Sequence, residues 1–169
     1  MGIHREISLL EPELRKRVEH ALIEFERRNL PVLISETLRD ADVQKAYYAQ
    51  GRAPLDEVNK MRGKAGLYLL SPRENTHTVT NCDGVKYKSN HQARDESGYG
   101  YAIDLVPAKV DERGNKSFWW NAPQEVWERM GAIGEECGLD WCYGGKGESW
   151  GWDTPHFEIL KSYEEKESN

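Results

Sequence analysis

The sequence contains little cysteine and no long apolar run. Only Cys82, Cys137 and Cys142 occur among its 169 residues, and they form no Cys-x-x-Cys pair. This pattern excludes a disulfide framework and a cysteine-based zinc knuckle, so we expect reduced, partly buried thiols. No stretch is apolar for long enough to span a bilayer, and the first residues lack the apolar segment of a secretory signal. We therefore expect that the protein does not insert into a membrane and that it is made as a soluble cytoplasmic chain.

Blocks of basic residues are also absent. The formal net charge is −6, and Lys and Arg are not clustered as phosphate binding requires, so we expect no nucleic-acid partner. Hydrophobic residues make up 38% and charged residues 31% of the chain, which is polar but still typical of a globular protein. The length favours one domain, residues 1–169, with a charged and frayed tail from about 161 to 169, and we expect a monomer.

Hydrophobic periodicity predicts both helices and strands. Ser8 and Glu11 have capping-box spacing ahead of Pro12, which predicts a helix running to about Arg28. The mixture of elements predicts an α+β fold, a single compact domain in which a small antiparallel sheet is flanked by helices. The remaining predicted elements are helices over 41–50, 54–61 and 121–137, strands over 31–35, 102–106 and 156–160, and a hairpin turn over 110–116.

Two stretches contain residues of metal-ligand type. His91 and Asp104 lie in the first, and Asp153 and His156 lie in the second. Catalytic zinc takes three protein ligands and keeps a fourth position open, a set that His91, Asp104 and His156 would supply. Zinc also needs a carboxylate beside its water to take a proton, and Asp153 is placed for this role. Such residues are also common as simple hydrogen-bonded groups, so spacing alone leaves a structural role open.

The motifs around these residues resemble those of a known family. The similarity is to the LAS zinc peptidases, which include D,D-carboxypeptidases, D,D-dipeptidases and the L-alanyl-D-glutamate endopeptidases of phage lysins. The early and penultimate segments also look like those of the family, and the match covers most of residues 32 to 160. The matching motifs are Ser89-x-His91, Gly100-x-Ala102-x-Asp104, Asp153-x-Pro155-His156-Phe157-Glu158, Ser35-x-x-Leu38-Arg39 with Gln44, Tyr48 and Ala49-Gln50-Gly51-Arg52, and Leu139-x-Trp141 with Gly144-Gly145 and Trp150.

The resemblance implies a role for each matching residue. It implies zinc ligation by His91, Asp104 and His156 in a cleft over the sheet, and general-base catalysis by Asp153. Arg39 matches the arginine thought to steady the substrate carbonyl and its developing oxyanion.

The chain departs from the family pattern in one place. The family usually places its first His and its Asp seven positions apart, whereas His91 and Asp104 are thirteen apart because residues 94–99 are inserted. A polar, glycine-containing insert can loop out, and we interpret it as a surface excursion and a candidate rim of the substrate groove. Asp95 is the alternative ligand to Asp104, but it lies in the insert. Glu158 shares a strand face with His156, which makes it a candidate partner of that histidine.

The function that the resemblance implies is zinc-dependent cleavage of the L-alanyl-D-glutamate bond in peptidoglycan stem peptides by a phage or prophage endolysin. Such a lysin would accumulate in the host cytoplasm and reach the wall through holin-dependent release. Two alternatives remain: a D-alanyl-D-alanine carboxypeptidase or dipeptidase using the same site, and a non-catalytic binding module that keeps the zinc fold. Trp150, Trp152 and Tyr143 are candidates both for the groove and for the core.

Overall fold

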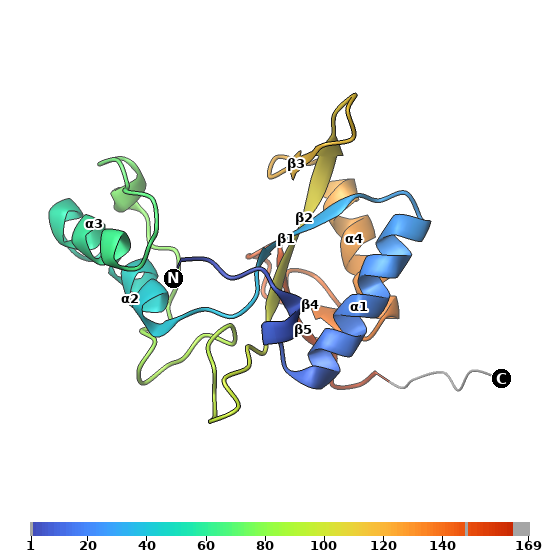
Figure 1. The fold of residues 1–169 in the computed structure, drawn as a ribbon, viewed down its shortest axis with the longest axis horizontal. Coiled ribbons are helices and arrows are strands. Elements are labelled where there is room, and N and C mark those ends of the chain that lie inside the picture. The colour runs from blue at the N-terminus through green and yellow to red at the C-terminus, as the bar shows by residue number, and fades with distance from the viewer. Residues whose placement is uncertain (1, 148, 164–169) are drawn as a thin grey trace.

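The computed structural model describes residues 2–147 and 149–163, which form helices around one antiparallel sheet (Figure 1). The strand order is β1-β2-β5-β4, and β3 pairs with the far end of β2. These elements confirm the predicted α+β fold. The strands are β1 (Val32–Glu36), β2 (Ile103–Val110), β3 (Lys116–Phe118), β4 (Leu139–Trp141) and β5 (His156–Ile159).

Helices α1 (Pro12–Arg27) and α4 (Gln124–Glu136) pack together beside the sheet, on the opposite side of the view from α2 and α3 (Figure 1). Their apolar faces and the inner face of the sheet form the hydrophobic core. Each helix contributes side chains spaced three or four residues apart, and each strand contributes every second side chain. The core side chains include Leu14, Val18 and Phe25 from α1, Trp127, Met130 and Ile133 from α4, and Ile103, Leu105, Leu139 and Phe157 from the strands.

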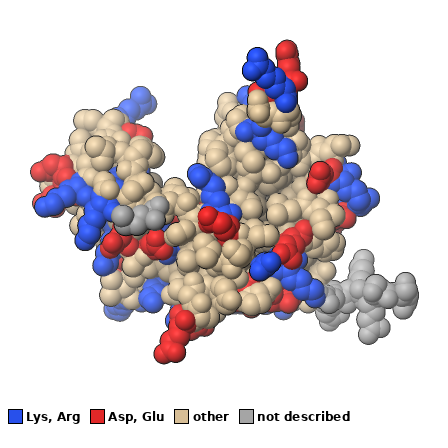
Figure 2. All heavy atoms as spheres, in the orientation of Figure 1, with Lys and Arg blue, Asp and Glu red and all other residues tan. Residues whose placement is uncertain are grey.

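Helices α2 (Ala41–Ala49) and α3 (Leu55–Lys64) contact each other and form a helical lobe, residues 41–64, away from that core (Figure 1). In the same orientation the surface is hollowed between the helical lobe and the body that carries the sheet (Figure 2). No helix in the described part of the chain is long and apolar enough to cross a membrane.

Several predicted boundaries are correct and others are wrong. The α1 cap is Glu11, whose carboxylate accepts a hydrogen bond from the backbone N–H of Leu14 at 2.9 Å. Ser8 is not the cap, because it lies in a short 3₁₀ turn, Ile7–Leu9, ahead of the helix. The predicted turn at 110–116 does join β2 to β3.

Two elements differ more from the predictions. The helix predicted over 54–61 extends to Lys64 as α3, through Gly63. Strand β4 was not predicted, because its three residues are too few to show an alternating pattern. Most of the tail predicted to be frayed, from 164 onward, lies outside the described residues.

Candidate metal centre

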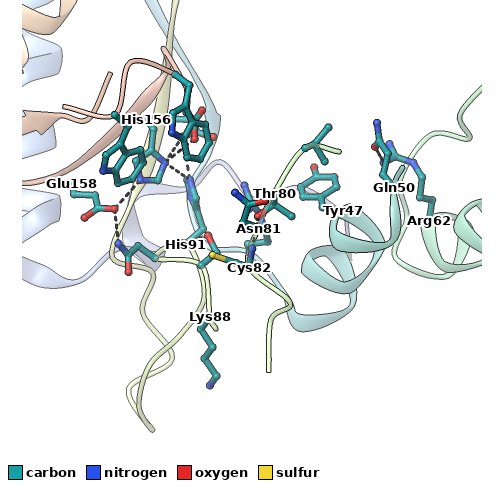
Figure 3. A pocket seen from close by; sticks show the side chains of 18 of the residues that line it. Tyr47, Gln50, Arg62, Thr80, Asn81, Cys82, Lys88, His91, His156 and Glu158 are labelled. Atoms are coloured by element: carbon teal, nitrogen blue, oxygen red, sulfur yellow. Dashed lines mark hydrogen bonds and ion pairs between the residues drawn. The ribbon is translucent and has the colours of Figure 1, made fainter. Parts of the chain in front are cut away.

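Three potential metal ligands converge where β2 pairs with β5. Asp104 on β2 and His156 on β5 are paired directly across the two strands, so their side chains lie on the same face. His91 comes from the loop that precedes β2, and its ring meets the ring of His156 edge-on with centroids 4.9 Å apart (Figure 3). All three residues are buried, with 1%, 9% and 4% of the surfaces of His91, Asp104 and His156 exposed.

The three donor atoms form a nearly equilateral triangle. His91 Nε2 lies 3.1 Å from Asp104 Oδ1 and 3.2 Å from His156 Nδ1, and the third side, from His156 Nδ1 to Asp104 Oδ1, is 3.2 Å. Ligands at zinc's usual bond lengths are about 3.3 Å apart in a tetrahedral site. The three atoms therefore have the spacing of one face of such a tetrahedron, which leaves the fourth corner for another ligand.

The opposite nitrogen of each ring is held by a fixed acceptor. His91 Nδ1 lies 2.7 Å from the backbone carbonyl of Thr37, so it carries the proton and leaves the Nε2 lone pair facing the triangle. His156 Nε2 lies 2.9 Å from Glu158 Oε1, which likewise turns the Nδ1 lone pair inward. Asn90 donates to the same carboxylate oxygen at 2.5 Å and holds it in place. Contacts of this kind orient metal-binding histidines in proteins.

The electrostatics of the triangle call for a positive charge. Burial opposes the ionisation of Asp104, but the charges and hydrogen bonds of His91 and His156 outweigh it and hold the pKa of that carboxyl well below its usual range. Burial lowers the pKa of His156, but hydrogen bonds to Asp104 and Glu158 raise it to about 10. A single proton on His156 Nδ1 can be shared with only one neighbouring atom at a time, whereas a metal ion would be bound by all three donor atoms together. The donor set therefore fits a zinc ion.

A second group of potential ligands shares His156. Cys142, His156 and Glu158 also offer ligand atoms within 4.8 Å of one another. In that set His156 would bind through Nε2, and its hydrogen bond to Glu158 would be lost. The Sγ of Cys142 already lies 3.6 Å from the carbonyl of Asp140, and burial leaves its residue fully enclosed. The triangle of His91, Asp104 and His156 is the better candidate, because both rings there keep their fixed acceptors.

Asp153 lies beside the triangle with a backbone conformation that is rare for its residue type. Its φ is 61°, in the left-handed region that aspartate tolerates better than most side chains and that often occurs at active sites. Its Oδ2 is 3.7 Å from His156 Nδ1. Burial, and then the nearby charge of Asp104, raise the pKa of Asp153. This carboxylate is therefore a stronger base than an ordinary aspartate and lies beside the triangle.

Arg39 is fixed by two side chains whose roles the sequence did not reveal. Its Nε and Nη2 donate to the two carboxylate oxygens of Glu36 at 2.8 and 2.6 Å, and Nη1 donates to Gln44 Oε1 at 2.9 Å. Burial lowers the pKa of Arg39, but the bidentate bond to Glu36 outweighs it and raises that pKa. Three of the five N–H groups of a guanidinium are engaged in this way, and the other two remain for a ligand.

The backbone ties Arg39 to the metal ligands. Its backbone N–H donates to the carbonyl of His91 at 2.9 Å, so the segments that carry these two residues are held side by side. Gly100 packs against this junction, because a Cβ there would lie 3.0 Å from the His91 oxygen and 3.1 Å from the Cα of Leu38.

The triangle, Asp153 and Arg39 line one cavity of about 590 Å³ between the sheet and the helical lobe. Trp150 and Trp152 lie on its wall and stack with ring centroids 5.4 Å apart, and Trp150 also packs on His156 at 5.2 Å. Tyr143 is not in the wall, because its ring packs on Trp141 at the core. Its candidate role in the groove is therefore wrong.

The insert at 94–99 contributes no side chain to the wall of this cavity. Asp95 is exposed and accepts hydrogen bonds from Ser97 and from the hydroxyl of Tyr101. It therefore does not replace Asp104, and the interpretation of the insert as a rim of the groove stays a prediction. The insert is an exposed excursion, held by the packing of Arg94 on the ring of Tyr101 at 4.8 Å.

The sequence did not indicate which groups support the site residues. Gln44 belongs to one of the matching motifs, but no role was assigned to it. Its place five residues after Arg39, on the first turns of α2, was the signal that could have linked the two. Glu36 ends β1 and precedes Arg39 by three residues, a spacing that suits an ion pair. The Thr37 carbonyl left no signal, because a backbone acceptor is independent of residue type.

No protein-family model matches the chain, and no curated protein matches its sequence. Solved structures with a similar fold include an L-Ala D-Glu endopeptidase, ChiX, of Serratia marcescens, with 19% identity, 90% of this chain and 82% of that chain covered, and a TM-score of 0.42. The LD-carboxypeptidase LdcB has 9% identity, 89% and 59% coverage, and a TM-score of 0.45. The D,D-pentapeptidase VanY, solved with Zn(II), has 13% identity, 89% and 72% coverage, and a TM-score of 0.46. These are peptidases of the kind that the motifs resemble.

Proposed function

We propose that the protein is a zinc-dependent peptidase that cleaves the L-alanyl-D-glutamate bond of peptidoglycan stem peptides. The observation that carries the proposal is the triangle of His91, Asp104 and His156 donor atoms, 3.1 to 3.2 Å on each side, with the Asp153 carboxylate beside it. The choice of bond rests on the motifs, which resemble those of the phage endopeptidases.

His91 Nε2, Asp104 Oδ1 and His156 Nδ1 would hold the zinc ion. When bound, zinc supplies a Lewis acid that polarises a carbonyl and lowers the pKa of a water molecule toward neutrality. Asp153 would take the proton from that water, since its raised pKa makes it a competent base, and would then deliver it to the amine of the leaving D-glutamyl residue.

Arg39 would stabilise the negative charge that develops on the substrate carbonyl oxygen. Its two remaining N–H groups are preorganised by the bonds to Glu36 and Gln44, so little reorganisation is needed during the reaction. The stacked rings of Trp150 and Trp152 offer an apolar wall along which a peptide can lie.

The bond is tested by incubating the zinc-loaded protein with purified peptidoglycan. We expect new N-terminal D-glutamate, and we expect none from an Asp153→Asn variant prepared in the same way. Release of D-alanine from a pentapeptide, without new D-glutamate termini, would identify the carboxypeptidase alternative. Zinc binding without hydrolysis of either substrate would identify a non-catalytic binding module.

The proposal includes a biological role as a phage or prophage lysin. On this proposal the enzyme accumulates in the cytoplasm of the bacterial host and reaches the wall when a holin opens the membrane. Expression in bacteria with and without a holin tests it: we expect lysis only when both proteins are made. Lysis without the holin would contradict this route.

A further inference from the structure

Arg62 on α3 is a buried arginine at the end of the cavity farthest from the metal ligands. Only 2% of its surface is exposed, yet it lines the same cavity as His91 and His156. Figure 3 shows Arg62 and Gln50 at one end of this cavity and His156 at the other, with Tyr47 between them. The acidic residues of the wall, Asp104, Asp153 and Glu158, all belong to the His156 end.

The hydrogen bonds of Arg62 within the described chain go to neutral acceptors. Nε donates to the carbonyl of Tyr68 at 2.7 Å, and Nη1 reaches Gln50 Oε1 at 3.4 Å. Gln50 is itself fixed, since its Nε2 donates to the carbonyl of Glu74 at 3.1 Å. The guanidinium also lies over the ring of Tyr68 at 4.5 Å and near that of Tyr47 at 5.8 Å.

No carboxylate of the described residues forms an ion pair with Arg62. Glu74 is the acidic side chain of this region, and its carboxylate is engaged by the backbone N–H and hydroxyl of Ser71 at 2.7 and 2.8 Å. These hydrogen bonds lower the pKa of Glu74, and the charge of Arg62 lowers it further without an ion pair between the two side chains. Arg39 differs, because Glu36 neutralises it from 2.6 Å. The Nη2 group of Arg62 has no hydrogen-bond partner in the described part of the chain.

A buried charge that no ion pair neutralises is costly, and a guanidinium offers a fork of N–H groups that matches a carboxylate. We propose that Arg62 is a specificity-determining residue that binds a carboxylate of the substrate at the far end of the cavity. This inference rests on the proposed function, under which the substrate is an acidic stem peptide. The carboxylate would belong to the part of the peptide that begins with D-glutamate. This part extends away from the metal ligands and carries free carboxyl groups.

Tyr47 would separate the two parts of the substrate. Its ring lies 4.9 Å from the guanidinium carbon of Arg39 on one side and 5.8 Å from that of Arg62 on the other. A peptide whose scissile carbonyl meets Arg39 would therefore pass over Tyr47 before its carboxylate reaches Arg62. Arg39 acts on the reacting group in this arrangement, and Arg62 selects the substrate.

The test measures binding and so does not depend on turnover. The probe is the dipeptide γ-D-glutamyl-L-lysine with free carboxylates, compared by calorimetry with the same dipeptide carrying carboxamides. We expect the protein to bind the acid about tenfold or more tightly than the amide, because hydrogen bonds to charged groups are the stronger ones. Arg62→Gln should remove this preference, and Arg62→Lys should keep part of it. The matched control is Arg73→Gln, which changes an exposed arginine outside the cavity and should keep the full preference.

Circular dichroism melting of each variant separates loss of the site from loss of the fold. An equal preference for the acid in the unaltered protein and in Arg62→Gln would overturn the inference, and so would the absence of any preference in the unaltered protein. Failure of the proposed function would look different: peptidoglycan would yield no new D-glutamate termini while the Arg62-dependent preference for the acid persisted.

Discussion

The two ends of the cavity are built from different parts of the molecule. The metal-ligand end, called the sheet end below, is formed by β2 and β5, where Asp104 and His156 are paired across hydrogen-bonded strands, and by His91 from the loop before β2. The Arg62 end lies on the helical lobe and on the loop at Tyr68, away from the sheet. Strands fix ligand atoms to within tenths of an ångström, whereas a lobe joined by loops can change without disturbing them. Under the proposed function, the reaction would take place beside the sheet and the substrate would be selected at the helical lobe.

The strongest test of the sheet end is His91→Ala. We expect the bound zinc to fall from about one ion per chain to almost none, with complete loss of hydrolysis, because two protein ligands rarely hold a catalytic zinc. Metal analysis of the purified variant measures the change. His77→Ala is the matched control, since His77 is exposed and lies outside the cavity. Full zinc content in His91→Ala would contradict the assignment of the ligands.

Asp153→Asn should separate catalysis from metal binding within the sheet end. We expect zinc to remain bound while kcat falls by about 10² to 10⁴-fold, the usual contribution of a general base. The measurement is hydrolysis of peptidoglycan fragments together with metal analysis. Unchanged hydrolysis would show that another group takes the proton, and loss of zinc would show that Asp153 is a ligand.

Arg39→Lys tests whether the two arginines of the cavity have different roles. Lysine keeps the charge but cannot make the bidentate bond to Glu36 and still present an N–H group to the carbonyl. We expect kcat to fall about 10²-fold with little change in KM, as for loss of one oxyanion donor. A rise in KM at constant kcat would place Arg39 with Arg62 as a substrate-binding residue. Arg73→Lys serves as the control.

Glu158→Gln should give the smallest effect. The glutamine oxygen can still accept the hydrogen bond from His156 Nε2, so only the negative charge is lost. We expect zinc affinity to weaken by about tenfold, at the low end of the range for groups that contact a metal ligand. Competition with a chelator measures the affinity. An unaltered affinity would mean that the hydrogen bond to the ring suffices and that the negative charge of Glu158 contributes nothing to zinc binding.

The same comparison explains what could be predicted from the sequence. His91, Asp104, Asp153 and His156 lie in motifs that resemble those of a zinc peptidase family, so the resemblance implied a zinc site before their distances were known. The pairing of Asp104 with His156 follows from two predicted strands, although their register could not be read from the sequence. The ligand roles themselves stay predictions until metal is measured.

Arg62 could not be identified in this way. Its neighbours Gln50 and Tyr68 are twelve and six residues away, and the segment between α2 and the loop at Tyr68 shows only a short helical pattern. Burial of its charge depends on how the helical lobe folds, which local propensity does not determine. Ser8 was misjudged for a related reason, because the 3₁₀ turn that contains it is set by the surrounding chain.

The hydrogen bond between the Arg39 N–H and the His91 carbonyl has a mechanical consequence. It couples Arg39, which is proposed to meet the substrate oxygen, to His91, a proposed metal ligand, and the close packing of Gly100 restricts movement at this junction. A displacement of the loop at 89–100 would carry both along together, preserving their separation. The insert at 94–99 extends outward from this restrained segment. The length of the insert can therefore change during evolution without altering the distance between Arg39 and His91.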